Sequence, residues 1–196
     1  MTESITSYAT LAAGYMLAFA VAALLTPFVR EVALRQQWVD RPDEDRKRHK
    51  RPTPAIGGIA IVGGFCAGLV YLVAFQGGLF FDVAYPPFTL GLGALLMVGG
   101  GLYDDLSGMS FKTKFVMQVA VAYLLVHAGY RIDLTGFEFV GADPYEHALY
   151  SIPLTMLWIV GVINAVNLLD GLDGLASGVV LIAFAFLALI FGVQGQ

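Results

Sequence analysis

Apolar residues along the 196-residue chain are grouped in six long runs, which short polar stretches separate. A helix of roughly 20 residues is needed to cross a bilayer core of about 30 Å, and each run approaches that length. The pattern predicts six helices, over residues 8–29, 56–75, 88–103, 110–130, 149–169 and 175–193. The expected fold class is therefore all-α, a polytopic transmembrane helix bundle that forms a single integral membrane domain over residues 1–196.

The composition strengthens this prediction. Hydrophobic residues make up 58% of the chain and charged residues 13%, against roughly 25% charged residues in soluble domains. Residues 56–81 and 174–196 contain no Asp, Glu, Lys or Arg. Such stretches favour lipid surroundings and exclude an ordinary soluble fold.

The basic residues predict the orientation, because Lys and Arg favour cytoplasmic loops. Ten of the 11 lie at or in the connections after the first and third helices. We therefore expect the N-terminus outside, the connections 76–87 and 131–148 also outside, and three cytoplasmic loops, 30–55, 104–109 and 168–174. Within the second outer connection, Arg131–Val140 alternates polar and apolar residues in the manner of a short β-hairpin.

Tyr103, Asp104 and Asp105 end the third predicted helix. Sixteen residues at 1.5 Å each give about 24 Å of helix, which puts the two carboxylates near the depth of the lipid headgroups. Asp-Asp-Leu-Ser-Gly could equally be a turn and a helix cap, since Asp, Ser and Gly commonly serve there. Adjacent ionised carboxylates at the edge of lipid are costly, and a bound divalent cation would offset that cost.

Four polar residues recur every third position at the inner end of the fifth helix: Asn164, Asn167, Asp170 and Asp173. While the backbone is helical, they form one slowly drifting stripe. The alternative is that the two Asp-Gly pairs merely turn the chain, which explains the glycines but neither asparagine. Polar side chains on one stripe of an otherwise apolar helix indicate a functional site.

Five cations stand among the six residues Arg46–Arg51. Such a run can be a positive-inside anchor or a contact for anionic lipids. Two prolines then stiffen the entry to the second helix, and Gly57–Gly58 would let a backbone or ligand approach closely. A loop fixed in this way could hold Lys50 against a phosphate.

Together the three clusters resemble the polyprenyl-phosphate N-acetylhexosamine-1-phosphate transferases, the glycosyltransferase 4 family, which initiates peptidoglycan lipid, O-antigen and teichoic acid synthesis. The segments that begin at Val39, Tyr103 and Trp158 occur in the family's order and spacing. The Arg-Lys-Arg-His element at 46–49 is most similar to the undecaprenyl-phosphate GlcNAc-1-phosphate transferases. The resemblance implies a multi-pass protein of the bacterial inner (plasma) membrane with its active site on the cytoplasmic side.

The resemblance also implies the reaction, in which undecaprenyl phosphate attacks the β-phosphate of a UDP-sugar, with UDP-GlcNAc favoured, and UMP leaves. Mg²⁺ is the implied cofactor, with Mn²⁺ as an alternative; membrane lipids and a homodimer partner are implied contacts, and nucleic acid is not. The implied catalytic residues are Asp104 and Asp105, the metal ligands are Asp170 and Asp105, and the substrate-binding residues are Lys50, His49, Asn164, Asn167 and Asp173.

The sequence departs from the family's pattern in two respects. Gly108 stands where some relatives carry a further aspartate. The family also continues for several more helices, so we expect residues 1–196 to be the N-terminal portion of a longer transferase domain. A truncated non-catalytic homologue or a scaffold membrane protein is therefore the alternative.

Two other classes fit the sequence less well. CDP-alcohol phosphatidyltransferases carry an arginine after the motif's alanine, whereas Ser177 follows Ala176 here. A transporter would place ionisable residues near the middle of its helices, whereas the clusters here stand at the ends of the predicted helices.

Overall fold

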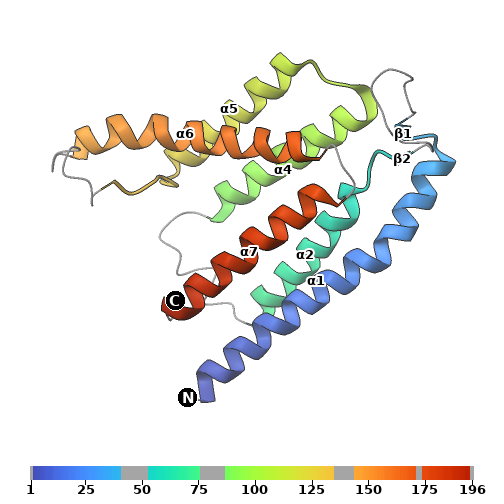
Figure 1. Cartoon of the computed structure of the whole chain (residues 1–196), viewed down its shortest axis with the longest axis horizontal. Coiled ribbons are helices and arrows are strands. Elements are labelled where there is room, and N and C mark those ends of the chain that lie inside the picture. Colours follow the sequence, from blue (N-terminus) through green and yellow to red (C-terminus); the bar gives the residue numbers. More distant parts are fainter. Residues whose placement is uncertain (1, 41–52, 76–86, 135–143, 171–173, 195–196) are drawn as a thin grey trace. The chain divides into compact units, whose positions relative to one another are not determined.

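The computed structural model describes the chain apart from residues 1, 41–52, 76–86, 135–143, 171–173 and 195–196. Within this described part there are six helices and two short strands (Figure 1). In chain order they are α1 (Thr2–Arg35), β1 (Val39–Asp40), β2 (Thr53–Pro54), α2 (Gly58–Phe75), α4 (Pro87–Ser107), α5 (Phe111–His127), α6 (Pro144–Leu169) and α7 (Leu175–Gln194).

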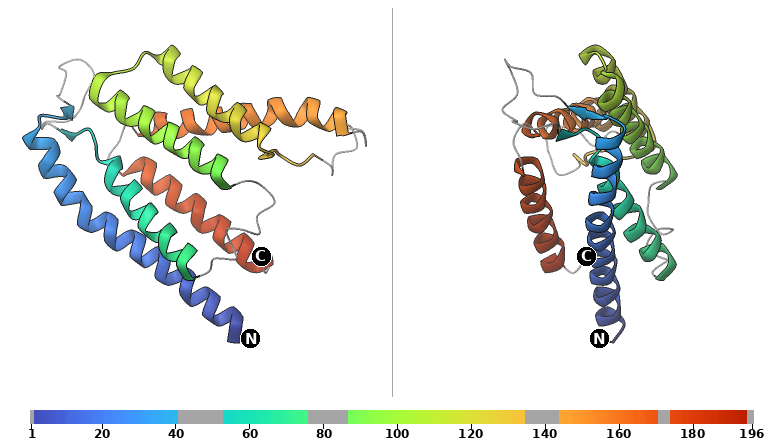
Figure 2. Two further views of the ribbon diagram at one scale, coloured as in Figure 1. Left: turned by 180° about the vertical axis from the view of Figure 1, so that it is seen from behind. Right: turned by 90° about the vertical axis from the view of Figure 1, so that its right-hand side faces the viewer.

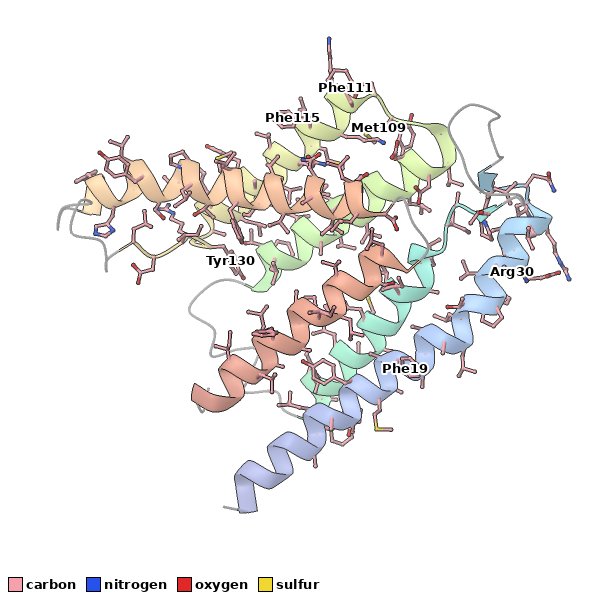
Figure 3. The ribbon with its side chains drawn as sticks, in the orientation of Figure 1. Phe19, Arg30, Met109, Phe111, Phe115 and Tyr130 are labelled. Atoms are coloured by element: carbon pink, nitrogen blue, oxygen red, sulfur yellow. The ribbon has the colours of Figure 1, made fainter. Side chains whose placement is uncertain are left out.

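The all-α transmembrane class is confirmed, with one helix at each of the six predicted positions. In the described part, three segments are long and apolar enough to cross a membrane: Ala9–Arg35, Gly58–Phe75 and His147–Leu169. Large apolar side chains are exposed along the helices, among them Phe19 at 77% and Phe115 at 53% (Figure 3). Exposed apolar surface of this extent suits lipid rather than water, so the protein is a membrane protein.

Several helix boundaries differ from the prediction. Helix α4 continues to Ser107, so Asp104 and Asp105 belong to its last turns and not to a loop. Helix α6 begins at Pro144, inside the connection expected over 131–148. Residues 131–134 are not a strand, and the rest of the hairpin expected there, up to Val140, lies outside the described residues.

The chain divides into two compact units, Met1–Phe111 and Lys112–Gln196. In the first unit α1 and α2 lie side by side (Figure 2). Glycines allow this close approach: a Cβ atom on Gly64 would come within 2.7 Å of the Ala22 Cβ, and one on Gly68 within 2.9 Å of the Ala18 Cβ. Small residues at the interface are the usual way in which membrane helices pack closely.

The end of this unit that carries Asp104 and Asp105 has its own apolar core. Val29 and Ala33 of α1 pack with Ile56 and Ala60 at the start of α2, and Leu102 of α4 packs against this cluster. These contacts anchor the last turns of α4, where the two aspartates stand, to the ends of α1 and α2.

In the second unit, the segment after α5 is attached to α6. Gly129 takes a positive φ of 103° and ends α5. The backbone of Ile132 then bonds twice to α6: its N–H donates to Thr155 Oγ1 at 2.9 Å, and its carbonyl accepts from Ser151 Oγ at 2.6 Å. Both hydroxyl residues are 5% exposed, so these bonds fix the segment after α5 to the first half of α6.

Candidate functional site

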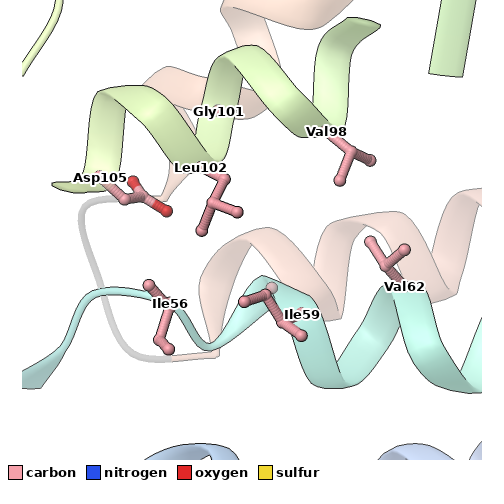
Figure 4. Close-up of a pocket in the computed structure, with 8 residues that line it drawn as sticks. Ile56, Ile59, Val62, Val98, Gly101, Leu102 and Asp105 are labelled. Carbon is pink, nitrogen blue, oxygen red and sulfur yellow. The ribbon is translucent and has the colours of Figure 1, made fainter. Parts of the chain in front are cut away.

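Asp105 is the predicted catalytic residue whose surroundings the structure defines best. It stands three residues after Leu102, so both lie on one face of α4. With Val98 it lines a pocket of about 200 Å³, whose opposite wall is the start of α2, including Ile56 and Ile59 (Figure 4). The pocket is mostly apolar with one carboxylate at its end, a combination suited to an amphipathic ligand.

Asp104, the neighbouring predicted catalytic residue, has a different environment. Its Oδ1 atom accepts a hydrogen bond from the backbone N–H of Met109 at 2.8 Å, and its carbonyl accepts one from Gly108 N–H at 2.8 Å. Gly108 has a φ of 72°, a conformation that glycine adopts without strain. Asp104 thus shapes the turn between α4 and α5, which is the turn-forming part of the alternative that the sequence left open.

A two-stranded clasp holds the ends of the basic segment together. Strands β1 and β2 pair antiparallel, with Val39 opposite Pro54 and Asp40 opposite Thr53. The Ala55 N–H extends the pairing by donating to the Trp38 carbonyl at 3.0 Å. The predicted substrate-binding residues His49 and Lys50 lie between the strands in sequence and outside the described residues.

The clasp leads directly to the Asp105 pocket. Strand β2 ends at Pro54. Ile56, two residues later, belongs both to the apolar core formed with α1 and to the pocket wall. In this unit the residues that directly follow β2 therefore lie beside Asp105. Residues 46–51 lie outside the described residues, so the approach of the basic cluster to the aspartates stays a prediction.

The third cluster belongs to the second unit. Asn167 and Asp170 are exposed at the end of α6, where the Asp170 N–H still donates to the Val166 carbonyl at 3.2 Å. The predicted polar stripe is therefore helical up to Asp170. Asp173 lies outside the described residues, and the convergence of all three clusters stays a prediction.

Asn164, predicted to bind substrate, contacts another helix. Its Nδ2 donates to Gln118 Oε1 of α5 at 2.7 Å and to the Val160 carbonyl at 2.8 Å. Gln118 is 4% exposed within an otherwise apolar stretch of α5. Gln118 itself is the signal in the sequence that points to this contact, because an amide inside an apolar helix must find a partner.

Lys112 and Lys114 are a second feature, to which the sequence motifs assign no part in the site. They stand in the first turn of α5, where there is no acidic residue. Cations are disfavoured at a helix N-terminus, which attracts anions. Two lysines at this end of α5 therefore concentrate positive charge of the kind that phosphate groups require.

Each unit carries donor atoms of the kind that Mg²⁺ prefers. Asp105 of the first unit has a carboxylate, and Asn167 and Asp170 of the second have amide and carboxylate oxygens. Mg²⁺ is usually held by one or two carboxylates, waters and substrate phosphates. Among the described residues no group of three or more His, Cys, Asp or Glu side chains gathers as a metal cage. Such a cage is not needed for an ion that arrives with a diphosphate substrate.

The fold and these features define a class: a helical membrane protein that presents acidic residues at helix ends and a clasped basic segment. The sequence pattern described as glycosyl transferase family 4 matches residues 87–196. The chain belongs to this family, which confirms the resemblance drawn from the three motifs.

Individual relatives agree. A Bacillus subtilis (strain 168) protein named "Probable undecaprenyl-phosphate N-acetylglucosaminyl 1-phosphate transferase" is 35% identical over 85% of this chain and 44% of its own length. A Mycolicibacterium smegmatis decaprenyl-phosphate N-acetylglucosaminephosphotransferase is 34% identical over 82% of this chain and 41% of its own.

The undecaprenyl-phosphate alpha-N-acetylglucosaminyl 1-phosphate transferase of Escherichia coli (strain K12) is 30% identical over 91% of this chain and 46% of its own. The chain thus spans less than half the length of these curated relatives. No solved structure matches it.

Proposed function

We propose that this protein contributes the acidic and basic groups for transfer of GlcNAc-1-phosphate from UDP-GlcNAc to undecaprenyl phosphate. An oxygen of the lipid phosphate attacks the β-phosphorus of the UDP-sugar, the bond from that phosphorus to the bridging oxygen breaks, and UMP leaves. The product is a lipid-linked pyrophosphoryl sugar of the kind that starts cell-wall, lipopolysaccharide or teichoic acid polymers.

One observation carries the proposal: the Asp105 pocket is walled by the first turns of α2 and by Ile56, which stands two residues beyond the clasp. The acceptor is a phosphate on an apolar chain, and the pocket joins apolar walls to a polar end. Family membership supports the same reaction, since the named relatives use polyprenyl phosphates and N-acetylglucosamine phosphate.

The residue roles follow from their positions and charges. Asp105 faces the reacting phosphates, whereas Asp104 holds the turn that orients it. His49 and Lys50 bind donor phosphates, and Lys112 and Lys114 add positive charge at the start of α5. Asn167, Asp170 and Asp173 bind the nucleotide side of the donor.

A metal ion belongs to this proposal. Asp105 and Asp170 would hold Mg²⁺, with Mn²⁺ as a substitute, and the ion would supply positive charge that offsets the repulsion between the diphosphate and the incoming lipid phosphate. A phosphate monoester has a second pKa of about 6, so the acceptor is already largely ionised near neutral pH. Asp105 therefore has a positioning and electrostatic task that does not depend on removing a proton.

We propose that the site lies in the inner membrane and faces the cytoplasm, because the distribution of basic residues favours that side and UDP-sugars are found there. The test is incorporation of labelled GlcNAc from UDP-GlcNAc into lipid by the purified protein with undecaprenyl phosphate, with Mg²⁺ or with EDTA. We expect lipid product only when acceptor and Mg²⁺ are both present. Product that persists in EDTA would contradict the metal's role, and no product under any condition would favour the non-catalytic alternative.

A further inference from the structure

We propose that Gln118 is a positioning residue for the transfer reaction: its side-chain amide holds Asn164 and thereby sets the rotation of the α6 turn that carries Asn167 and Asp170. The inference rests on the proposed function. It assigns Asn164 to the support of the site, in place of the direct substrate contact that the sequence predicted.

The identity of the bonded atoms is fixed by chemistry. The Val160 carbonyl can only accept a hydrogen bond, so the Asn164 atom 2.8 Å from it must be the nitrogen Nδ2. The Gln118 atom 2.7 Å from this same Nδ2 must then be an acceptor, which is Oε1. The arrangement therefore does not depend on how either amide was assigned.

These two bonds occupy both N–H donors of the Asn164 amide. A substrate phosphate, which only accepts hydrogen bonds, could take a donor from Asn164 only if one of these bonds broke. Asn164 keeps one acceptor, Oδ1. The side chain is thus poorly suited to bind phosphate and well suited to join two helices.

Burial makes the bond specific. Gln118 is 4% exposed, and Val121, Ala122 and Val126 are buried on the same helix. An unpaired primary amide in such surroundings is unfavourable, so Gln118 holds its partner firmly. Any rotation of α6 that moves Asn164 away leaves the Gln118 acceptor without this bond.

The rotation at Asn164 is transmitted to the proposed metal ligand. Asn164, Asn167 and Asp170 are spaced by three residues, so each lies one helical turn further along the same drifting stripe. The backbone remains helical between them, as the bond from Asp170 N–H to the Val166 carbonyl shows. Holding one member of the stripe therefore directs the other two.

The experiment compares Gln118→Leu, Asn164→Leu and the double variant by steady-state transfer kinetics and by thermal unfolding in detergent. We expect Gln118→Leu to lower kcat by about tenfold to hundredfold, the effect of a small misplacement in an active site, with little change in KM for UDP-GlcNAc. The double variant should lose no more than the stronger single variant, because the two residues act as one unit.

Thr155→Val is the matched control. It removes another buried side-chain hydrogen bond between α6 and the segment after α5, fifteen residues before Asp170, and should lower thermal stability with kcat unchanged. The swap Gln118→Asn with Asn164→Gln restores the donor and acceptor and should regain part of the kcat that Gln118→Asn alone loses.

The outcomes separate the two proposals. If the wild-type protein is active and Gln118→Leu has the same kcat, the positioning role is overturned and the proposed function is not. A raised KM in Asn164→Leu that Gln118→Leu does not share would show direct substrate contact and overturn it too. A wild-type protein that transfers nothing would overturn the proposed function and this inference with it.

Discussion

The Oδ1 atom of Asp104 accepts the backbone N–H of Met109 at 2.8 Å, whereas the neighbouring Asp105 lines the pocket opposite the start of α2. Two adjacent carboxylates of one motif thus have separate tasks. Successive residues of a helix point about 100° apart, so the backbone itself assigns one side chain to the turn and the other to the pocket.

The first prediction separates these tasks by stability. Asp104→Ala removes the acceptor for Met109 N–H and should lower the free energy of unfolding by about 1 kcal/mol. Asp104→Asn keeps an oxygen in that place and should unfold near the wild-type temperature. Thermal unfolding in detergent measures both, and equal stability of the Ala and Asn variants would show that the bond contributes nothing.

The second prediction concerns chemistry. Asp105→Asn keeps the shape of the side chain but removes its charge, the one charge among the described residues that line the pocket, so transfer should fall by roughly a hundredfold or more. Asp104→Asn, assayed beside it, should retain more activity. The assignment fails if Asp105→Asn transfers as fast as the wild type.

Helix packing gives a third prediction. Gly64→Ala would bring a methyl group within 2.7 Å of the Ala22 Cβ on α1, and overpacking of this kind typically costs about 1–3 kcal/mol. Gly99→Ala on α4 is the control, because a Cβ there meets nothing within 4 Å. The first variant should unfold at a lower temperature and the second should not; matching midpoints would argue against the α1–α2 contact.

A fourth prediction tests the clasp. Ala55→Pro removes the N–H that donates to the Trp38 carbonyl, which loosens the C-terminal attachment of the segment containing Lys50. If that segment binds donor phosphates, KM for UDP-GlcNAc should rise roughly fivefold, the equivalent of about 1 kcal/mol. Lys50→Ala should change the same parameter, and a clasp variant that alters kcat alone would point to a different role.

The metal gives a fifth prediction. Asp170→Asn keeps the size of the side chain at the end of α6 but removes its charge, so the Mg²⁺ concentration for half-maximal activity should rise by at least about tenfold, a loss typical even of supporting residues at metal sites. An Mg²⁺ titration of the variant measures this. An unchanged titration curve would remove Asp170 from the metal site.

Much of the fold could be predicted from sequence because lipid imposes a simple rule, in which apolar runs of sufficient length become helices. Among the described residues, the three helices that are long and apolar enough to span a membrane lie where helices were expected. The end of α4 was not predictable in the same way, because Asp and Gly stand both in turns and in last helical turns. The bonds from Met109 N–H and Gly108 N–H show that Asp104, although it belongs to the last turns of α4, also shapes the turn that follows the helix.

The site was predictable as a set of motifs and less so as a set of contacts. The sequence placed Asn164 on the polar stripe correctly, but its partner Gln118 is 46 residues away on another helix, a separation that no local pattern reveals. The pairing of Val39–Asp40 with Thr53–Pro54 was missed because strands of two residues are too short for any alternation to appear.

The most direct test of the central claim follows both parts of the donor at once. UDP-GlcNAc labelled with ³²P at the β-phosphate and ¹⁴C in the sugar is incubated with the protein, undecaprenyl phosphate and Mg²⁺, and the lipid phase is counted. The proposed reaction carries both labels into lipid in equal molar amounts and releases unlabelled UMP. Sugar label in lipid with the ³²P left behind in UDP would contradict it, since the protein would then transfer the sugar without its phosphate.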